Sequence, residues 1–229
     1  MKYSTLLLDA DETLLDFSAA ERNALHTTMQ ELGHPITQAQ YMRYSEINDA
    51  QWKKLERGET TKPILIIERF SLFFEELGID FDPAFVNRKY LENLSLGSDL
   101  IEGALDFLET VQKHFALYLI TNGTAQVQIK RLATSGIGRF FSEVFISEAI
   151  GYTKPQLQYF SHVLAHIEEK DPKKVLVIGD SLSSDILGGQ TAGLDTCWFN
   201  RYNKKCTLSL PPTMEARDYP ELLALLGIH

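Results

Sequence analysis

Five short apolar runs, separated by polar and helix-periodic segments, constrain the fold of this chain more than any other feature of its sequence. Runs without apolar–polar alternation are typical of strands buried on both faces of a parallel sheet. Strands that alternate with helices predict a doubly wound α/β domain. The predicted strands are Tyr3–Leu8, Phe115–Ile120, Val144–Ile146, Val175–Ile178 and Thr196–Phe199, and the predicted helices are Glu102–His114, Ala125–Ser135, Gln156–Ile167 and Ser183–Ala192.

The segment 17–96 breaks this alternation, because it carries four helix signals and no strand signal. The signals are a start at Ser18 with Glu21 and a stop at Gly33, a cap at Thr37 with a stop at Gly58, Thr61 before Pro63 with a stop at Gly78, and Asp82 before Pro83. A length of 229 residues also exceeds one domain of ~150 residues without reaching two. We therefore expect a Rossmann-like core of residues 1–16 and 97–229, with an inserted four-helix domain at 17–96.

Composition and charge exclude several classes of protein. Hydrophobic residues make up 44% and charged residues 23%, so the chain can bury a core and is not disordered. A net charge of −9 argues against binding to nucleic-acid polymers or anionic membranes. No apolar run reaches the ~20 residues of a spanning helix. The first residues do not resemble a signal peptide, and Cys197 and Cys206 form no disulfide or zinc pattern, so we expect a cytoplasmic protein.

Polar side chains follow the predicted strands at four places far apart in the sequence. Because ligands of open parallel sheets bind at the carboxyl ends of the strands, these side chains are expected to meet in one cleft. They are Asp9 and Asp11, then Thr121, Asn122 and Gly123, then Lys154 before Pro155, and finally Asp180 and Asp185.

The set suits phosphoryl transfer. A carboxylate that attacks a phosphate dianion needs a cation between the two charges, and Asp9 and Asp180 offer the hard oxygen ligands that Mg²⁺ prefers. Lys154 adds a fixed positive charge. The Thr121 hydroxyl and the backbone amides around Asn122 and Gly123 can hold phosphate oxygens.

Asp9 and Asp11 stand two residues apart, so an extended backbone points both carboxylates toward the same substrate. One can act as the nucleophile and the other as the proton donor, which is worth ~10²–10⁴-fold for a poor alkoxide leaving group. The second carboxylate can later deprotonate the water that hydrolyses an aspartyl-phosphate.

These four segments resemble the motifs of the haloacid dehalogenase superfamily, and the helical insertion lies where that family has its cap. The resemblance implies that Asp9 is the nucleophile, Asp11 the general acid/base, and Thr121 and Lys154 phosphate ligands. It implies one Mg²⁺, held by the Asp9 side chain, the Asp11 backbone carbonyl and Asp180 and supported by Asp185, and that divalent cations such as Mn²⁺ can substitute. An acid at position 11 favours a phosphatase over a dehalogenase, because a halide leaves without a proton.

A narrower resemblance is to the bacterial pyrimidine 5′-nucleotidases. It is carried by DADETL, the region of Trp52, ITNG, RLATSGIGRFF, ISEAIGYTKP, GDSLSSDILGG and AGLDTCWFN. It implies a small phosphomonoester substrate, namely a nucleoside monophosphate such as UMP, dUMP or dTMP. Phe17, Tyr44 and Trp52 are candidates for base recognition, although aromatic residues at helical spacing also suit a core.

Two other functions stay open at this point. One is a sugar-phosphate phosphatase or mutase of the same superfamily. The other is a non-enzymatic phospho-aspartate switch, which also places acids, a hydroxyl and a lysine at strand ends; the inserted helical domain argues against it. We expect a monomer or a weak homo-oligomer.

Overall fold

The structure, a computed structural model, describes residues 2–228. The chain divides into two compact units. The α/β unit contains the residues up to Asp16 and those from Ser98 onward, and the helical unit is Phe17–Gly97. The chain leaves the α/β unit after Asp16 and returns to it at Ser98. These two points of the α/β unit lie side by side, because the Asp16 amide donates to the Asp99 carbonyl (2.9 Å) and Leu15 forms a β-bridge with Leu100.

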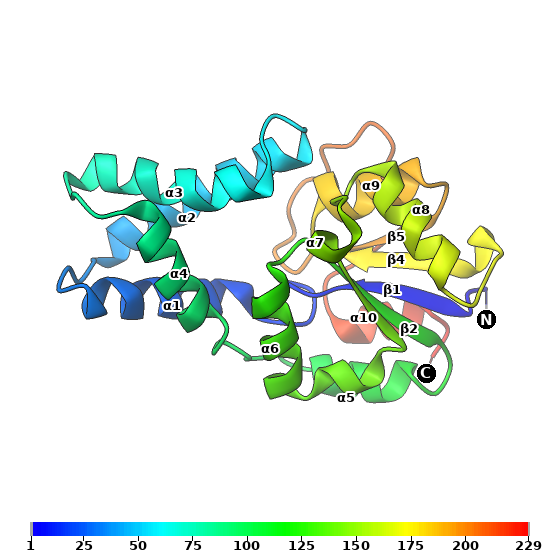
Figure 1. Cartoon of the computed structure of the whole chain (residues 1–229). Coiled ribbons are helices and arrows are strands. Elements are labelled where there is room, and N and C mark those ends of the chain that lie inside the picture. The colour runs from blue at the N-terminus through cyan, green and yellow to red at the C-terminus, as the bar shows by residue number, and fades with distance from the viewer. Residues whose placement is uncertain (1, 229) are drawn as a thin grey trace. The chain divides into compact units, whose positions relative to one another are not determined.

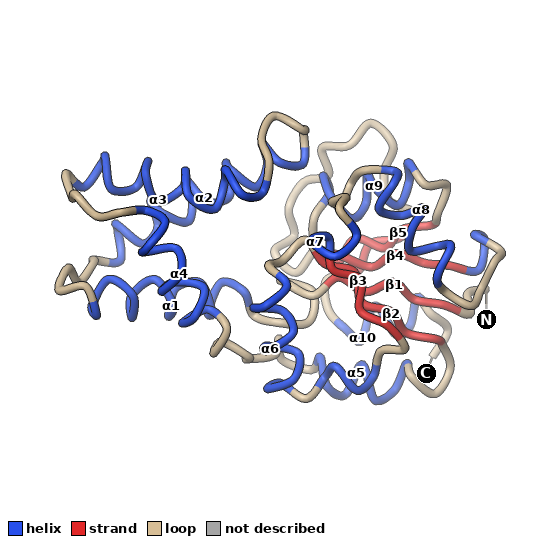
Figure 2. The backbone as a smooth tube through the Cα atoms, viewed as in Figure 1, coloured by secondary structure: helices blue, strands red, loops and turns tan. Residues whose placement is uncertain are grey.

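The α/β unit is built on one parallel sheet, which confirms the predicted fold class (Figures 1 and 2). Its order among the described residues is β3-β2-β1-β4-β5-β6, so the first strand of the sequence lies in the middle of the sheet. The strands are β1 Thr5–Asp9, β2 Ala116–Thr121, β3 Glu143–Ile146, β4 Val175–Gly179, β5 Asp195–Phe199 and β6 Met214–Ala216. β6 was not predicted, because it is three residues long and has the charged Glu215 at its centre.

Helices connect these strands and cover both faces of the sheet. They are α5 Ala104–Val111, α6 Ala125–Ser135, α7 Ser147–Ile150, α8 Leu157–His166, α9 Leu187–Thr191 and α10 Tyr219–Leu225, with 3-10 turns at Ile137–Phe140 and Pro172–Lys174. The single helix predicted at Ser183–Ala192 is wrong in detail, because a π-helical turn at Leu182–Ile186 precedes α9. The short helices α7 and α10 were also missed.

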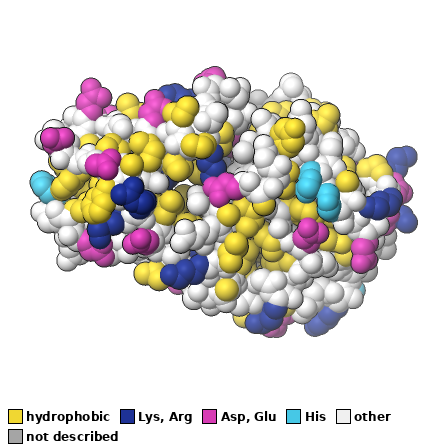
Figure 3. Space-filling model, viewed as in Figure 1, with side chains coloured by type: hydrophobic (Ala, Val, Ile, Leu, Met, Phe, Trp, Pro, Cys, Tyr) yellow, Lys and Arg dark blue, Asp and Glu magenta, His cyan; other side chains and the backbone are white. Residues whose placement is uncertain are grey.

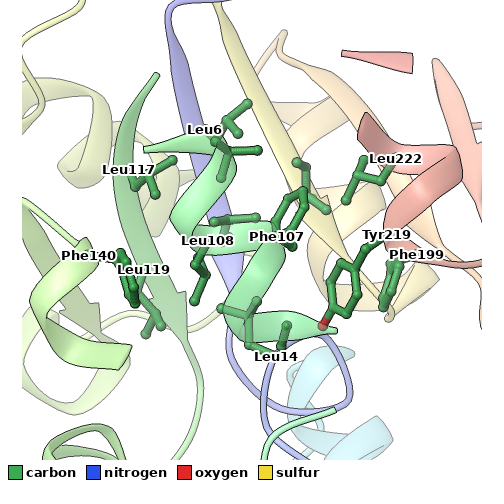
Figure 4. Close-up of a cluster of buried hydrophobic side chains, with 14 of the residues drawn as sticks. Leu6, Leu14, Phe107, Leu108, Leu117, Leu119, Phe140, Phe199, Tyr219 and Leu222 are labelled. Carbon is green, nitrogen blue, oxygen red and sulfur yellow. The ribbon is translucent and has the colours of Figure 1, made fainter. Parts of the chain in front are cut away.

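Alternate residues of the central strands enter two different hydrophobic cores. Leu6 and Leu8 of β1 belong to the larger cluster, together with Phe107 of α5 and Tyr219 of α10 (Figure 4). Leu7, which points to the opposite face, packs in the cluster that includes α8. Burial of both faces explains why the strands are continuously apolar, and it holds β1 and its terminal Asp9 in a fixed position.

The helical unit consists of α1 Phe17–Glu31, α2 Gln38–Glu56, α3 Lys62–Leu77 and α4 Pro83–Leu94. Capping side chains begin α2 and α4 as predicted: Thr37 forms a capping box with Gln40, and Asp82 accepts from the Ala84 amide (3.0 Å). The predicted start of α1 is wrong, because the helix begins one residue before Ser18. The Glu21 carboxylate instead contacts α2.

Glu21 is one end of a buried polar network inside the helical unit. Its carboxylate accepts from Ser45 (2.9 Å) and Asn48 (2.7 Å). Arg69 donates to Asn48 (3.0 Å) and to Asn87 (2.8 Å), so the network links all four helices. Burial raises the pKa of Glu21 above its ordinary value.

Acidic and basic side chains are interspersed on the face of the molecule drawn in Figure 3. Several form exposed ion pairs, such as Arg43 with Glu76 (2.7 Å), and pairs of this kind contribute little to stability. No helix within residues 2–228 combines the length and the apolar character that a membrane span requires.

Candidate active site

Lys154 connects two of the predicted carboxylates at the carboxyl edge of the sheet. Its Nζ lies 2.6 Å from Asp9 Oδ1 and 2.7 Å from Asp185 Oδ1, and it also donates to the Ile120 carbonyl (3.1 Å). The side chain is 2% exposed. Burial opposes its charge, but Asp185 and Asp9 outweigh this effect and raise the pKa of Lys154, so the ammonium is a permanent positive charge.

Asp180 completes a cluster of three carboxylates with Asp9 and Asp185. One oxygen from each lies within 4.8 Å of the others. Burial raises the pKa of Asp9 to about 7, although Lys154 opposes the shift, and Asp185 and Asp11 raise it further. Burial, followed by the charge of Asp9, raises the pKa of Asp180 as well. An arrangement that concentrates negative charge in a buried place is stabilised by a cation.

Hard oxygen donors at this spacing fit Mg²⁺. Asp9 and Asp180 are the side chains that would hold it. Asp185 is already engaged at both oxygens, because Oδ1 faces Lys154 and Oδ2 accepts from the Ser181 amide (3.2 Å). Asp185 therefore suits a supporting position more than a ligand position.

Gly179, the last residue of β4, makes room for Asp185. A Cβ atom at Gly179 would lie 2.3 Å from Asp185 Oδ2, a distance that real Cβ atoms essentially never show. The next residue is fixed by its backbone, because Trp198 Nε1 donates to the Asp180 carbonyl (2.8 Å). The sequence segment Gly179–Asp180 thus serves both the metal-binding candidate and its supporting carboxylate.

Asn122 holds the Lys154 segment in place. Its Nδ2 donates to the Lys154 carbonyl (2.9 Å), and its Oδ1 accepts from the Lys154 amide (2.9 Å). The peptide bond between Lys154 and Pro155 is cis. The Asn122 side chain therefore joins two segments that appear as separate motifs in the sequence.

Asp11 lies beside two residues that the sequence analysis did not single out. Arg131 Nη1 donates to Asp11 Oδ1, and Gln128 Nε2 donates to Asp11 Oδ2 (2.8 Å). Both partners come from α6 and are 1% exposed. In the sequence, the only signal was a glutamine and an arginine three residues apart in a predicted helix, and this spacing identifies no partner.

Thr121 ends β2 and is held from several directions. Its amide donates to the Tyr159 hydroxyl (3.1 Å), which in turn donates to the Phe145 carbonyl (2.8 Å). Its Oγ1 accepts from the Gly123 amide (3.0 Å) and from Gln128 Nε2 (2.8 Å). The predicted residues Asp9, Thr121, Lys154, Asp180 and Asp185 all lie at the carboxyl ends of neighbouring strands or just beyond them, as expected for ligand sites of parallel sheets.

The three aromatic candidates for base recognition belong to the helical unit and differ in accessibility. Tyr44 is fully buried, and its ring packs against Phe70 and Phe73 (both 5.3 Å between centroids). The expectation for Tyr44 is therefore corrected: it is a core residue and offers no ring face to a base in this structure. Phe17 and Trp52 are partly exposed, and Lys62 Nζ lies 5.8 Å from the centroid of the Trp52 ring.

The fold and the cluster together define a class: a parallel α/β protein with three clustered carboxylates at the carboxyl edge of its sheet. Residues 3–193 match the haloacid dehalogenase-like hydrolase family, and the chain belongs to this family. The resemblance inferred from the four motifs is thereby confirmed.

Three relatives are similar over essentially the whole chain. The HAD-hydrolase YfnB of Bacillus subtilis is 41% identical, covering 99% of this chain and 97% of its own length. The pyrimidine 5′-nucleotidase PynA of Streptococcus pneumoniae is 38% identical, covering 99% and 96%. The pyrimidine 5′-nucleotidase YjjG of Escherichia coli is 30% identical, covering 100% of both chains. A crystal structure of YfnB bound to magnesium superposes with a TM-score of 0.96 at 41% identity and full coverage of both chains.

Proposed function

We propose that this protein is a Mg²⁺-dependent phosphomonoesterase that hydrolyses pyrimidine nucleoside 5′-monophosphates through an aspartyl-phosphate at Asp9. The observation that carries the proposal is the group of Asp9, Lys154, Asp180 and Asp185, in which one fixed ammonium faces two buried carboxylates and the half-buried Asp180 carboxylate lies within 4.8 Å. The group carries one positive charge against three acids, so it favours a bound divalent cation.

In the first step, an Asp9 carboxylate oxygen attacks phosphorus, and the bond between phosphorus and the ester oxygen breaks. The electron pair of that bond leaves with the ester oxygen, which takes a proton from Asp11 and departs as the nucleoside hydroxyl. Thr13 Oγ1 donates to Asp9 Oδ2 (3.2 Å) and Lys154 holds Oδ1, so the nucleophile is oriented before substrate arrives.

In the second step, Asp11 takes a proton from water, and the resulting hydroxide attacks phosphorus. The bond between phosphorus and the Asp9 oxygen breaks, which regenerates the carboxylate and releases inorganic phosphate. Each turnover therefore consumes one water and returns Asp11 to its protonated state.

Lys154 and the Thr121 hydroxyl bind the phosphoryl oxygens in this proposal. Lys154 supplies a charge that stays positive at any working pH, and Thr121 supplies a hydroxyl held at the end of β2. The Asn122 backbone amide adds a further donor, whereas the Gly123 amide already donates to Thr121 Oγ1 (3.0 Å). A bound Mg²⁺ would neutralise the charge of the carboxylates and of the phosphate as they approach each other.

The nucleotide part of the proposal rests on relatives. Two of them, at 38% and 30% identity over nearly the whole chain, carry the name pyrimidine 5′-nucleotidase. Phe17 and Trp52 are the partly exposed aromatic candidates for contact with the base, since stacking on a ring face suits a pyrimidine.

Phosphate release from a panel of pyrimidine and purine nucleoside monophosphates, sugar phosphates and p-nitrophenyl phosphate tests the proposal. We expect release that requires Mg²⁺, stops in EDTA, is fastest with UMP, dUMP or dTMP, and is abolished in Asp9→Asn. Preference for a sugar phosphate would overturn the nucleotide assignment. Stable phosphorylation without turnover would indicate a switch, and full activity of Asp9→Asn would refute the mechanism.

A further inference from the structure

Two buried residues of α6 hold the carboxylate at position 11 by both of its oxygens. Arg131 binds Oδ1 and Gln128 binds Oδ2, and the two partners also contact each other, because Arg131 Nη1 donates to Gln128 Oε1 (3.2 Å). Asp11 is more open, with a side chain 26% exposed against 1% for Arg131. A planar guanidinium and an amide that are both held by the protein interior restrict the rotation of the carboxylate.

Gln128 has a second target on the neighbouring strand. The two hydrogens of its Nε2 go to Asp11 Oδ2 and to Thr121 Oγ1, each at 2.8 Å. Thr121 Oγ1 also accepts from the Gly123 amide (3.0 Å). A hydroxyl oxygen has two lone pairs, so with both occupied Thr121 can act toward a phosphate only as a donor.

Gly123 permits this contact. A Cβ atom at position 123 would lie 2.6 Å from Gln128 Cγ and from Gln128 Nε2. The glycine that follows Thr121 and Asn122 is therefore needed for the approach of Gln128, in addition to any approach of the backbone to a phosphate.

We propose that Gln128 and Arg131 are positioning residues of the reaction: Arg131 aligns Asp11 for proton transfer to the leaving group, and Gln128 aligns Asp11 and the Thr121 hydroxyl together. This inference rests on the proposed phosphomonoesterase function and concerns residues that touch neither the reacting phosphorus nor the cation ligands Asp9 and Asp180. It makes α6 the element that ties the acid/base to the phosphate-binding hydroxyl.

The leaving group distinguishes positioning from a merely structural role. A nucleoside alkoxide needs a proton as it departs, whereas p-nitrophenolate is a stable anion that does not. The value of kcat/KM reports the steps up to cleavage of the ester, so misalignment of Asp11 lowers it more for UMP than for p-nitrophenyl phosphate. General damage to the site lowers kcat/KM for both substrates by the same factor.

The central experiment measures kcat/KM for UMP and p-nitrophenyl phosphate in the wild type, Arg131→Met and Arg131→Lys. Because a general acid is worth ~10²–10⁴-fold, Arg131→Met is expected to lower the ratio of UMP to p-nitrophenyl phosphate at least ~10-fold. Arg131→Lys keeps a positive charge and is expected to recover part of the ratio. Arg139→Met, at a side chain that is 62% exposed, is the matched control and leaves the ratio unchanged.

Gln128→Met gives a second, independent variant, with the exposed Gln126→Met of the same helix as its control. Loss of Gln128 affects Thr121 as well as Asp11. We therefore expect kcat/KM to fall for both substrates and to fall further for UMP. If Arg131→Met does not fold, as judged by thermal unfolding, the result rests on Arg131→Lys and Gln128→Met.

The outcomes separate the inference from the proposed function. Wild type that releases phosphate from neither substrate with Mg²⁺ overturns the proposed function, and with it the inference. Active wild type with an unchanged ratio in the folded Arg131 and Gln128 variants overturns the inference alone. A lowered ratio in these variants, with the ratio retained in both controls, supports it.

Discussion

Replacing Asp9 with asparagine should make the metal-free protein more stable while removing its activity. Asparagine has nearly the same shape as aspartate and keeps an oxygen that can accept from Lys154 Nζ, now 2.6 Å from Asp9 Oδ1. It removes one of three clustered acids, and Lys154 keeps its ion pair with Asp185 (2.7 Å).

The magnitude follows from the pKa of Asp9, which burial raises from 3.8 to about 7. One pKa unit corresponds to ~1.4 kcal/mol, so ionisation of Asp9 in the folded, metal-free protein costs ~4 kcal/mol relative to the unfolded chain. Because the folded pKa is the higher one, the unfolded chain releases this proton first. The contribution of Asp9 to stability is therefore retained at low pH and lost as the pH rises through the interval from 3.8 to about 7.

Urea unfolding of wild type and Asp9→Asn in EDTA, at several pH values, measures the effect. At pH 8 the variant is expected to exceed the wild type by up to ~4 kcal/mol, and the difference should shrink toward zero near pH 4. Saturating Mg²⁺ should narrow the difference at pH 8, because the wild type has one more carboxylate ligand and gains more from binding.

A variant that is less stable than the wild type at pH 8 in EDTA would refute this reasoning. A stability difference that does not change between pH 4 and pH 8 would do the same, since it would show that the proton on Asp9 has no part in it. The first result would mean that Lys154 stabilises the ionised carboxylate more than burial destabilises it, and the second that the two effects cancel.

Two further substitutions test the packing of each unit. Gly179→Ala places a methyl group 2.3 Å from Asp185 Oδ2, so we expect the free energy of unfolding in urea to fall by ~1–3 kcal/mol. Because Asp185 must move, we also expect calorimetry to show weaker Mg²⁺ binding. Unchanged stability and Mg²⁺ affinity would show that Asp185 shifts freely. Arg69→Met removes the hydrogen-bond donor to the buried side-chain oxygens of Asn48 and Asn87, which should lower the free energy of unfolding by ~2–4 kcal/mol. We expect the amides of α2 and α4 to lose their protection from hydrogen exchange earlier than in the wild type. Equal protection in the variant would contradict the role of this network.

Much of the fold was predictable because its signals are local. Continuous apolar runs mark strands with two covered faces, and Thr37 and Asp82 carry the capping chemistry that begins α2 and α4. The start of α1 was not predictable in the same way. Ser18 and Glu21 have the spacing of a capping box, but Glu21 gains more partners from α2 than a helix start would offer.

In the candidate site, too, the residues with a local sequence signal were predictable and the others were not. Asp9 and Asp180 could be identified because each directly follows an apolar run, and strand ends of parallel sheets meet at one edge. Gln128 and Arg131 could not be identified in this way, because their role depends on contact with Asp11, which is more than 100 residues away in the sequence. Tyr44 shows the opposite error, since an aromatic residue suits both a binding surface and a core, and only its neighbours Phe70 and Phe73 decide.

The central place of β1 has a consequence for synthesis of the protein on the ribosome. β1 is made first, but its two neighbours, β2 and β4, begin at Ala116 and Val175. Asp9, the proposed nucleophile, is therefore synthesised long before any strand that can pair with β1. The helical unit Phe17–Gly97 is compact, so it can fold during this interval and shorten the effective distance between β1 and its partners. The proposed site is complete only when Asp180 and Asp185 have also been synthesised.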